Sequence, residues 1–347
     1  MQIFRESINR SHLRLLNSIP TEIQYTPASP ATLSFIKSPA AKSSCLGCIN
    51  PHCLWFSEEE ISCSKVENFP GDKTTDVCPV QAIKWDFDKE RPVIDSRKCI
   101  NCGLCASRCP VGAIYFNRKI VINYEDSNAV KCLPASDENA KAQREQLSKL
   151  QHVKRGGVLI QESDPLLEQI YGDLLNIRSN DHNTVVRNLL IGLGCNCSMR
   201  RIGDVYTRMD AVYSTVSESF GAVEVEFGRD TLDASRGILD DIAVLHTRYG
   251  IPKETNDAVV VCLQLPNARQ GYWQVIRDIR IVEGLRINTV TVGALLLLLW
   301  NNRLFDPSKG PFYIDYDNMD LRRIIEHQLG KKVRLSHRNL GILEPMK

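Results

Sequence analysis

The sequence predicts two domains of different fold class, a small α+β module followed by a larger α/β domain with a mixed central sheet. Two observations lead to this prediction. Closely spaced cysteines are concentrated between residues 45 and 109, and the motif that contains them is repeated. Beyond residue 156, strand patterns alternate with helix patterns, which is typical of helices packed on a central sheet.

We divide the chain into four segments. These are an N-terminal arm at residues 1–44, the cysteine-rich module at 45–125, a linker at 126–155 and the α/β domain at 156–347. The arm is rich in Pro, Ser, Thr and Ala after Pro20, which favours a loop. The linker is polar, contains good helix formers and ends at Gly156 and Gly157, so we expect a connecting helix there.

The α/β domain has a clear order of predicted elements. We expect helices near 164–176 and 183–193, strands at about 204–213 and 221–227, a helix at 230–249, a buried strand at 258–263, a helix or irregular stretch near 272–282, a strand at 287–292, an apolar helix at 293–303 and a terminal helix at 318–329. The helix at 230–249 is well defined, because Ile238, Ile242 and Leu245 recur at helical spacing and Gly250 ends it.

Composition excludes several classes of protein. Of the 347 residues, 43% are hydrophobic and 24% charged, as in ordinary soluble proteins. The net charge of +2 means that any basic surface must be local. The N-terminus lacks the apolar segment of a signal peptide, and the most apolar run, Val292–Trp300, is far shorter than the ~20 residues that span a bilayer. We expect a cytoplasmic protein with no membrane partner.

Eight of the thirteen cysteines of the chain form two related motifs. The second motif reads Cys-x2-Cys-x2-Cys-x3-Cys-Pro from Cys99 to Pro110, and the first is a distorted copy with a long insertion. Both end in Cys-Pro-Val-x-Ala-Ile, at Cys78 and at Cys109. A short loop with this spacing can aim three sulfurs at one cubane, while the fourth cysteine ligates another.

These motifs resemble the two-cluster bacterial ferredoxins. The resemblance implies a ferredoxin-like α+β fold and two [4Fe–4S] clusters, each held by three cysteines of one motif and the last cysteine of the other. One set is then Cys45, Cys48, Cys53 and Cys109, and the other is Cys99, Cys102, Cys105 and Cys78.

Two alternatives stay open for this module. Because the spacing before Cys53 is longer than in the second motif, Cys63 could replace Cys53 as a ligand. Paired Cys-x2-Cys motifs also suit zinc, although zinc does not require the duplicated tail.

Carboxylates of the α/β domain suggest a second site. Side chains alternate along a strand, so Glu224 and Glu226 share one face, and Asp210 on the preceding strand can approach it. Three converging carboxylates repel one another unless a cation lies between them, and Mg²⁺ or Mn²⁺ suits oxygen ligands. The alternative is a solvated face of an antiparallel strand.

Residues 185–305 are similar to the PD-(D/E)xK nuclease fold, particularly to type II restriction endonucleases with a Glu-x-Glu variant. The resemblance implies a restriction-endonuclease-like domain in which Asp210, Glu224 and Glu226 are catalytic. Asp210 and Glu224 would ligate the metal, and Glu226 would take the place of the usual lysine. Asp204 is an alternative acid on the same strand, and Glu168 on an earlier helix could be the additional helix-borne acid of some members. Nearby arginines that could orient a phosphate backbone are Arg200, Arg201, Arg208, Arg229 and Arg236.

Three functions are compatible with these patterns. The first is an iron–sulfur-containing, divalent-metal-dependent DNA endonuclease of the restriction or defence type, which would require DNA as a partner and favour a homodimer. The second is a ferredoxin-type electron-transfer protein or oxidoreductase subunit with a redox partner. The third is a non-enzymatic DNA- or protein-binding factor that uses the clusters as a switch.

Overall fold

The computed structural model describes residues 54–86, 88, 91–108, 114–116, 122–124, 163–228, 231–301, 303–307, 320–333 and 340–347. The N-terminal arm and the predicted linker helix lie outside them. The chain divides into two compact units. The first unit contains Thr75–Ile170 and Leu299–Arg303 together with the residues that precede Glu58, and the second contains Glu58–Thr74, Tyr171–Leu298 and Leu304–Lys347.

The described residues of the first unit include two small antiparallel sheets and a short helix. Strand β1 (Ile83–Asp86) pairs with β2 (Arg91–Ile94), and β3 (Ile114–Phe116) pairs with β4 (Ile122–Tyr124). Helix α4 (Leu104–Arg108) follows the second cysteine motif. A small apolar core that includes Val77, Ala82, Ile100 and Leu104 is buried between these elements.

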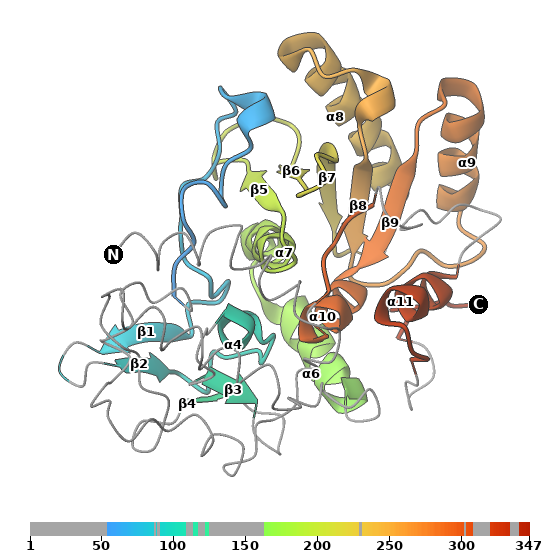
Figure 1. Cartoon of the computed structure of the whole chain (residues 1–347). Helices are drawn as coiled ribbons and strands as arrows, with labels where there is room; N and C mark the ends of the chain where they lie inside the picture. Colours follow the sequence, from blue (N-terminus) through green and yellow to red (C-terminus); the bar gives the residue numbers. More distant parts are fainter. Residues whose placement is uncertain are drawn as a thin grey trace. The chain divides into compact units, whose positions relative to one another are not determined.

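The second unit is organised around one mixed sheet with the strand order β5-β6-β7-β8-β9 (Figure 1). The first three strands are antiparallel, and the last three are parallel. Their bounds are β5 Asn196–Met199, β6 Ala211–Ser214, β7 Phe220–Glu226, β8 Ala258–Cys262 and β9 Ile287–Thr291. Strand β8, Ala-Val-Val-Val-Cys, is buried along its whole length, as expected for a central parallel strand.

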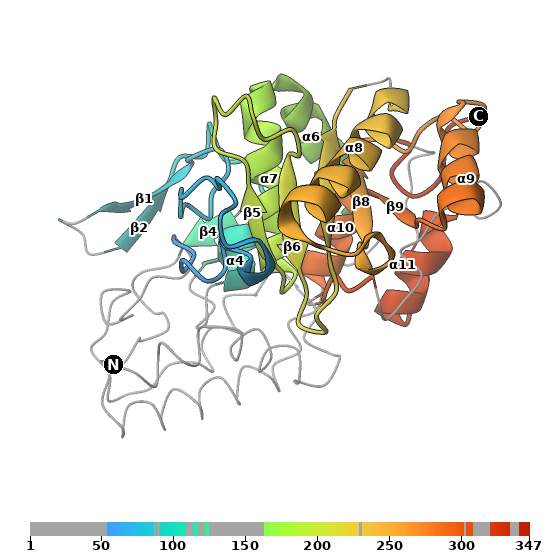
Figure 2. The ribbon, with the colours of Figure 1, turned by 90° about the horizontal axis from the view of Figure 1, so that it is seen from above.

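Helices connect and cover this sheet. Helix α8 joins β7 to β8, and α9 joins β8 to β9 (Figures 1 and 2), the usual crossover between parallel strands. After α4, the described residues form α6 Ser163–Asn176, α7 Ser179–Gly192, α8 Leu232–Tyr249, α9 Tyr272–Glu283, α10 Val292–Trp300 and α11 Leu321–Leu329. Short 3₁₀ turns lie at Ser64–Val66 and Lys253–Thr255. The predicted mixed α/β sheet is confirmed.

Two predicted features differ from the structure. The strand expected at 204–213 begins only at Ala211, because residues 201–208 form a loop that is closed by the side chain of Asp204. The structure also adds strand β5, which the sequence pattern did not reveal. Within the described residues, no helix is both long enough and apolar enough to cross a bilayer.

The insertion in the first cysteine motif belongs to the second unit. In the first unit, Phe56 donates to the carbonyl of Thr75 at 2.7 Å, so the two ends of the insertion lie side by side. Between them, Glu58–Thr74 pairs with the edge of β5. Its contacts include Cys197 N–H to Glu60 O at 2.9 Å and Asp72 N–H to Met199 O at 2.8 Å. The prediction assigned this stretch to the cysteine-rich module; in the structure it covers a sheet edge.

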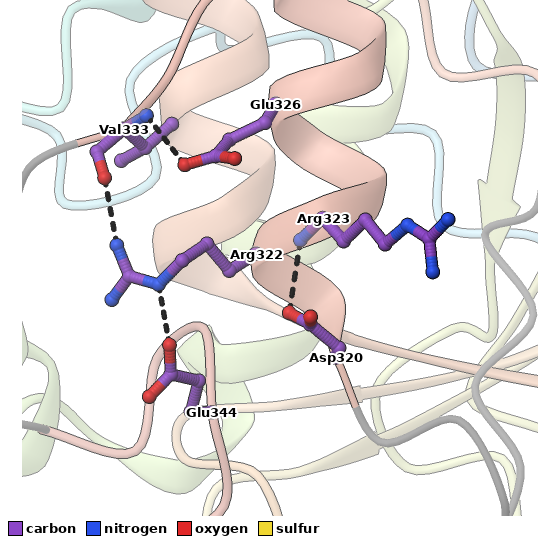
Figure 3. A network of polar contacts seen from close by, with 6 residues as sticks. All are labelled: Asp320, Arg322, Arg323, Glu326, Val333 and Glu344. Carbon is purple, nitrogen blue, oxygen red and sulfur yellow. Dashed lines mark hydrogen bonds and ion pairs between the residues drawn. The ribbon is translucent and has the colours of Figure 1, made fainter.

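A polar network fixes the C-terminal segment to α11 (Figure 3). Asp320 caps the helix by accepting the N–H of Arg323 at 3.0 Å. Arg322 donates to the carbonyl of Val333 at 2.7 Å and pairs with Glu344, while Glu326 accepts the N–H of Val333 at 2.9 Å. The last residues of the chain are thereby held against the second unit.

Glycine at position 221 is required by the close approach of two strands. Gly221 lies in β7 opposite Tyr213, and a Cβ built there would overlap the backbone carbonyl of Asp257. We expect Gly221→Ala to lower the free energy of unfolding by about 1–3 kcal/mol in urea titrations. Gly172→Ala is the matched control, because nothing lies within 4 Å of a Cβ there, and a gain of about 0.4–1 kcal/mol is expected. The opposite ranking of the two variants would contradict this packing.

Candidate functional site

The structure describes one of the two predicted sets of cluster ligands. Cys78, Cys99, Cys102 and Cys105 lie in the first unit, and their side chains are neither fully buried nor fully exposed. The other predicted ligands lie outside the described residues: Cys45, Cys48, Cys53 and Cys109.

The backbone of the second motif is shaped to present its thiols. Asn101 has φ +56° and Gly103 has φ +84°, so the chain turns twice through the left-handed region between Cys99 and α4. Two backbone N–H groups point at sulfur. Asn101 donates to Cys99 Sγ at 3.4 Å, and Ala82 donates to Cys78 Sγ at 3.1 Å. Such bonds favour thiolate and tune the potential of an iron–sulfur cluster.

The thiols of this set lie close enough to affect one another. Burial of its sulfur raises the pKa of Cys102, and the neighbouring Cys78 and Cys99 raise it further. Several thiolates in one place are therefore unfavourable without positive charge, which iron would supply. A set of sulfur donors of this kind suits an iron–sulfur cluster. As they stand, no three His, Cys, Asp or Glu side chains in the described ranges are arranged to hold a metal ion, so loading requires local adjustment.

A tryptophan far along the chain from the second motif supports it. Trp300 belongs to the first unit and is fully buried. Its indole N–H donates to the carbonyl of Cys102 at 2.8 Å. This contact fixes the loop that carries the ligand and keeps water away from one side of it.

A cavity of about 360 Å³ lies beside another ligand of the same set. Its wall includes the sulfur-bearing residue Cys78 and two aromatic residues, Trp55 and Trp85. The remaining lining residues are Leu54, Asp76, Gln81, Ile83 and Lys84. The ligand set is therefore approachable from one side.

The cysteines outside these motifs have other environments. Cys63 is buried in the second unit, where its thiol donates to the carbonyls of Asn196 at 3.5 Å and Val212 at 3.4 Å. Burial raises the pKa of Cys195 and Cys197, which keeps both thiols protonated. Cys262 is a core residue of β8, as predicted, and Cys132 lies outside the described residues. Cys53 as a ligand stays a prediction, because it lies outside the described residues.

The second unit brings Asp210 and Glu224 together. Ala211 pairs with Val223, so this antiparallel register places Asp210 opposite Glu224. Three groups hold the carboxylate of Asp210. Asn183 Nδ2 donates to it at 2.8 Å, the N–H of Val225 donates at 3.0 Å, and the guanidinium of Arg200 lies 3.5 Å away.

A third carboxylate, Asp241 on α8, completes this cluster. Burial raises the pKa of Glu224 to about 9, with Asp210 and Asp241 adding to the effect. Burial also raises the pKa of Asp241 to about 7, again with a contribution from Asp210. Asp241 is only 2% exposed, and its Oδ2 has no hydrogen-bond partner. The helix can approach because of Gly237, where a Cβ would lie 2.9 Å from Glu224 Oε1.

The position of Asp241 in the sequence indicates that its carboxylate is buried. On α8 it follows Ile238 by three positions and precedes Leu245 by four, so it lies within the apolar stripe of the helix. A carboxylate within such a stripe is buried, and a buried carboxylate needs a partner.

The other candidate acids have different roles in the structure. Glu226 is half-buried and accepts the N–H of Gly228 at 2.5 Å. Asp204 lies in the β5–β6 loop, and hydrogen bonds from the loop backbone lower its pKa. Glu168 is exposed on α6, and the helical side chain that reaches Asp210 is Asn183 instead. Arg236 pairs with Asp233 at the surface, and Arg229 lies outside the described residues.

Comparison with known proteins identifies the first site. Residues 75–113 match the family model of the 4Fe-4S dicluster domain. The chain is 39% identical over 61 residues to an uncharacterized ferredoxin of Methanocaldococcus jannaschii, a match that covers 17% of this chain and 36% of the relative. No solved structure matches the chain. Residues 75–113 are thus a ferredoxin-type iron–sulfur domain.

Proposed function

We propose that this chain is an electron-transfer protein whose first unit carries single electrons on [4Fe–4S] clusters. One observation carries the proposal. The segment that matches the dicluster domain contains Cys78, Cys99, Cys102 and Cys105, and backbone N–H groups are directed at two of these thiols. When bound, the cluster supplies one-electron redox chemistry at a potential that its surroundings set.

Among the described residues, apolar side chains cover the ligands on one side, and a cavity lies beside them on another. Trp300 and the apolar core cover the loop of Cys102, which lowers the local dielectric constant around the cluster. On the other side, Trp55 and Trp85 line the cavity next to Cys78. A redox partner that contacts this face would come close to a cluster ligand. The second cluster, held by Cys45, Cys48, Cys53 and Cys109, is part of the proposal and follows from the duplicated motif.

A second candidate function is divalent-metal-dependent hydrolysis of nucleic-acid phosphodiesters by the second unit. The observation that favours it is the cluster of Asp210, Glu224 and Asp241, in which Asp241 is buried with an unpartnered oxygen. Mg²⁺ or Mn²⁺ prefers carboxylate oxygens and, when bound, activates water and stabilises a charged phosphate. Arg200 is placed beside Asp210 to orient the substrate backbone. Cutting both strands of a duplex would require a second copy of the chain.

Removal of one thiol tests the first proposal. We expect Cys102→Ser to lose a cluster, because oxygen is a poor substitute for a thiolate ligand of iron. Iron analysis of anaerobically purified protein should fall from about eight atoms per chain to about four or fewer. Cys262→Ser is the matched control, since this cysteine belongs to the core of β8. Zinc in place of iron in the wild-type protein would overturn the proposal.

The pH dependence of stability tests the carboxylate cluster without any assay of activity. Between the ordinary pKa of 4.5 and the raised value of about 9, native Glu224 retains a proton that the unfolded chain has lost. The free energy of unfolding therefore falls as pH rises through this window. We expect Glu224→Gln to make that decline shallower in urea titrations. Mg²⁺ should stabilise the wild-type protein at pH 8 more than this variant, and an equal response of both would argue against a cation site.

Cleavage tests the second candidate directly. We expect anaerobically purified protein to cut plasmid DNA only with Mg²⁺ or Mn²⁺, and Glu224→Gln to reduce the rate by at least about 100-fold, as expected when a metal ligand is lost. Glu283→Gln, a change at the exposed end of α9, should retain the wild-type rate. If neither plasmid DNA nor single-stranded DNA is cut, the second unit serves another role and the electron-transfer proposal is unaffected.

A further inference from the structure

The loop between β5 and β6 exposes three large apolar side chains. The exposed fractions are 60% for Ile202, 81% for Val205 and 84% for Tyr206. Single exposed apolar residues are ordinary, but three within five positions form a patch that is unfavourable in water unless something covers it.

Hydrogen bonds within the loop fix this exposure. Asp204 Oδ1 accepts the N–H groups of Tyr206 at 2.8 Å and Thr207 at 3.2 Å, and Asp204 N–H donates to the carbonyl of Arg201 at 3.0 Å. Gly203 has φ +86°, which allows the tight turn. The polar side chain therefore faces the centre of the loop, and the apolar side chains face solvent.

The base of the loop adjoins the carboxylate cluster. Arg200 donates to the carbonyl of Thr207 at 3.3 Å, and its guanidinium lies 3.5 Å from Asp210 Oδ1. Arg208 pairs with Asp240 at 3.2 Å, but both side chains are more than half exposed. Such a surface pair contributes little to stability, so Arg208 can exchange its partner for a phosphate.

The loop has an aromatic side chain at its tip and arginines where it joins the sheet, and this combination matches the chemistry of a nucleic-acid strand. Arginines bind phosphates, and an exposed aromatic ring stacks on the face of a base. In a duplex the faces of the bases are covered by their neighbours, whereas an unpaired base offers a free face. The apolar residues beside the ring, Ile202 and Val205, can support it as a wedge between bases.

We infer that residues 200–208 form a stacking loop for an unpaired base of a nucleic-acid strand. Tyr206 stacks on the base, while Arg201 and Arg208 contact the flanking phosphates. One part of the inference rests on the second candidate function, namely that the nucleic-acid strand continues from this loop to Asp210 and Glu224. Binding itself requires neither the metal nor hydrolysis.

The experiment measures fluorescence anisotropy of labelled single-stranded oligonucleotides and of the matched duplex, in EDTA, with the full chain. We expect the wild-type protein to bind the single strand more tightly than the duplex. Tyr206→Ala should weaken single-strand binding by roughly ten-fold, within the range for loss of one stacked base. Tyr206→Phe should retain most of the affinity, because the ring is kept.

The control for exposed apolar surface is Val282→Ser on α9, where the wild-type side chain is 76% exposed and lies outside the loop. Its affinity should equal that of the wild-type protein. Equal binding of the duplex, no loss in Tyr206→Ala, or no binding of either oligonucleotide would overturn the inference. If single-strand binding depends on Tyr206 but no strand is cut when Mg²⁺ or Mn²⁺ replaces EDTA, the inference is upheld and the hydrolase function is rejected. Cleavage in Mg²⁺ or Mn²⁺ at a rate that Tyr206→Ala leaves unchanged would overturn the inference and support the hydrolase function.

Discussion

The antiparallel register between β6 and β7 is the constraint on which the second unit depends. Pairing of Ala211 with Val223 places Asp210 opposite Glu224, and a slip of one residue would send one of the two carboxylates to the other face. Once they face each other, the remaining features follow. Arg200 and Asn183 must hold Asp210, Gly237 must let α8 approach, and Asp241 must share the proton and the charge of its neighbours.

The first unit depends on a different kind of constraint, the spacing of sulfur ligands along the chain. Because that spacing can be read from the sequence, its resemblance to the two-cluster ferredoxins predicted the set Cys78, Cys99, Cys102 and Cys105 before any fold was known. The structure adds what spacing does not contain. Left-handed turns at Asn101 and Gly103 present the thiols, and Trp300, almost two hundred residues downstream, holds the loop of Cys102.

The sequence predicted regular, strongly periodic elements well and irregular ones poorly. Helices α8 and α9 and strands β7 to β9 agree with the expected order, because their apolar residues have the period of a helix or a buried strand. Residues 204–208 were predicted as part of a strand, since Val205 and Tyr206 favour strands, yet the side chain of Asp204 closes the backbone into a turn. Asp241 was missed because its partners, Asp210 and Glu224, come from strands that only tertiary structure brings near.

The placement of Glu58–Thr74 has a consequence for how the chain is made. During synthesis, the residues around the first cysteine motif leave the ribosome well over a hundred residues before β5, with which this segment pairs. The thiol of Cys63, for example, donates to Val212, 149 positions later. Closing so long a loop is slow. The cysteines on either side of the insertion are therefore available to iron before the insertion can pair with β5. The sheet is completed only afterwards.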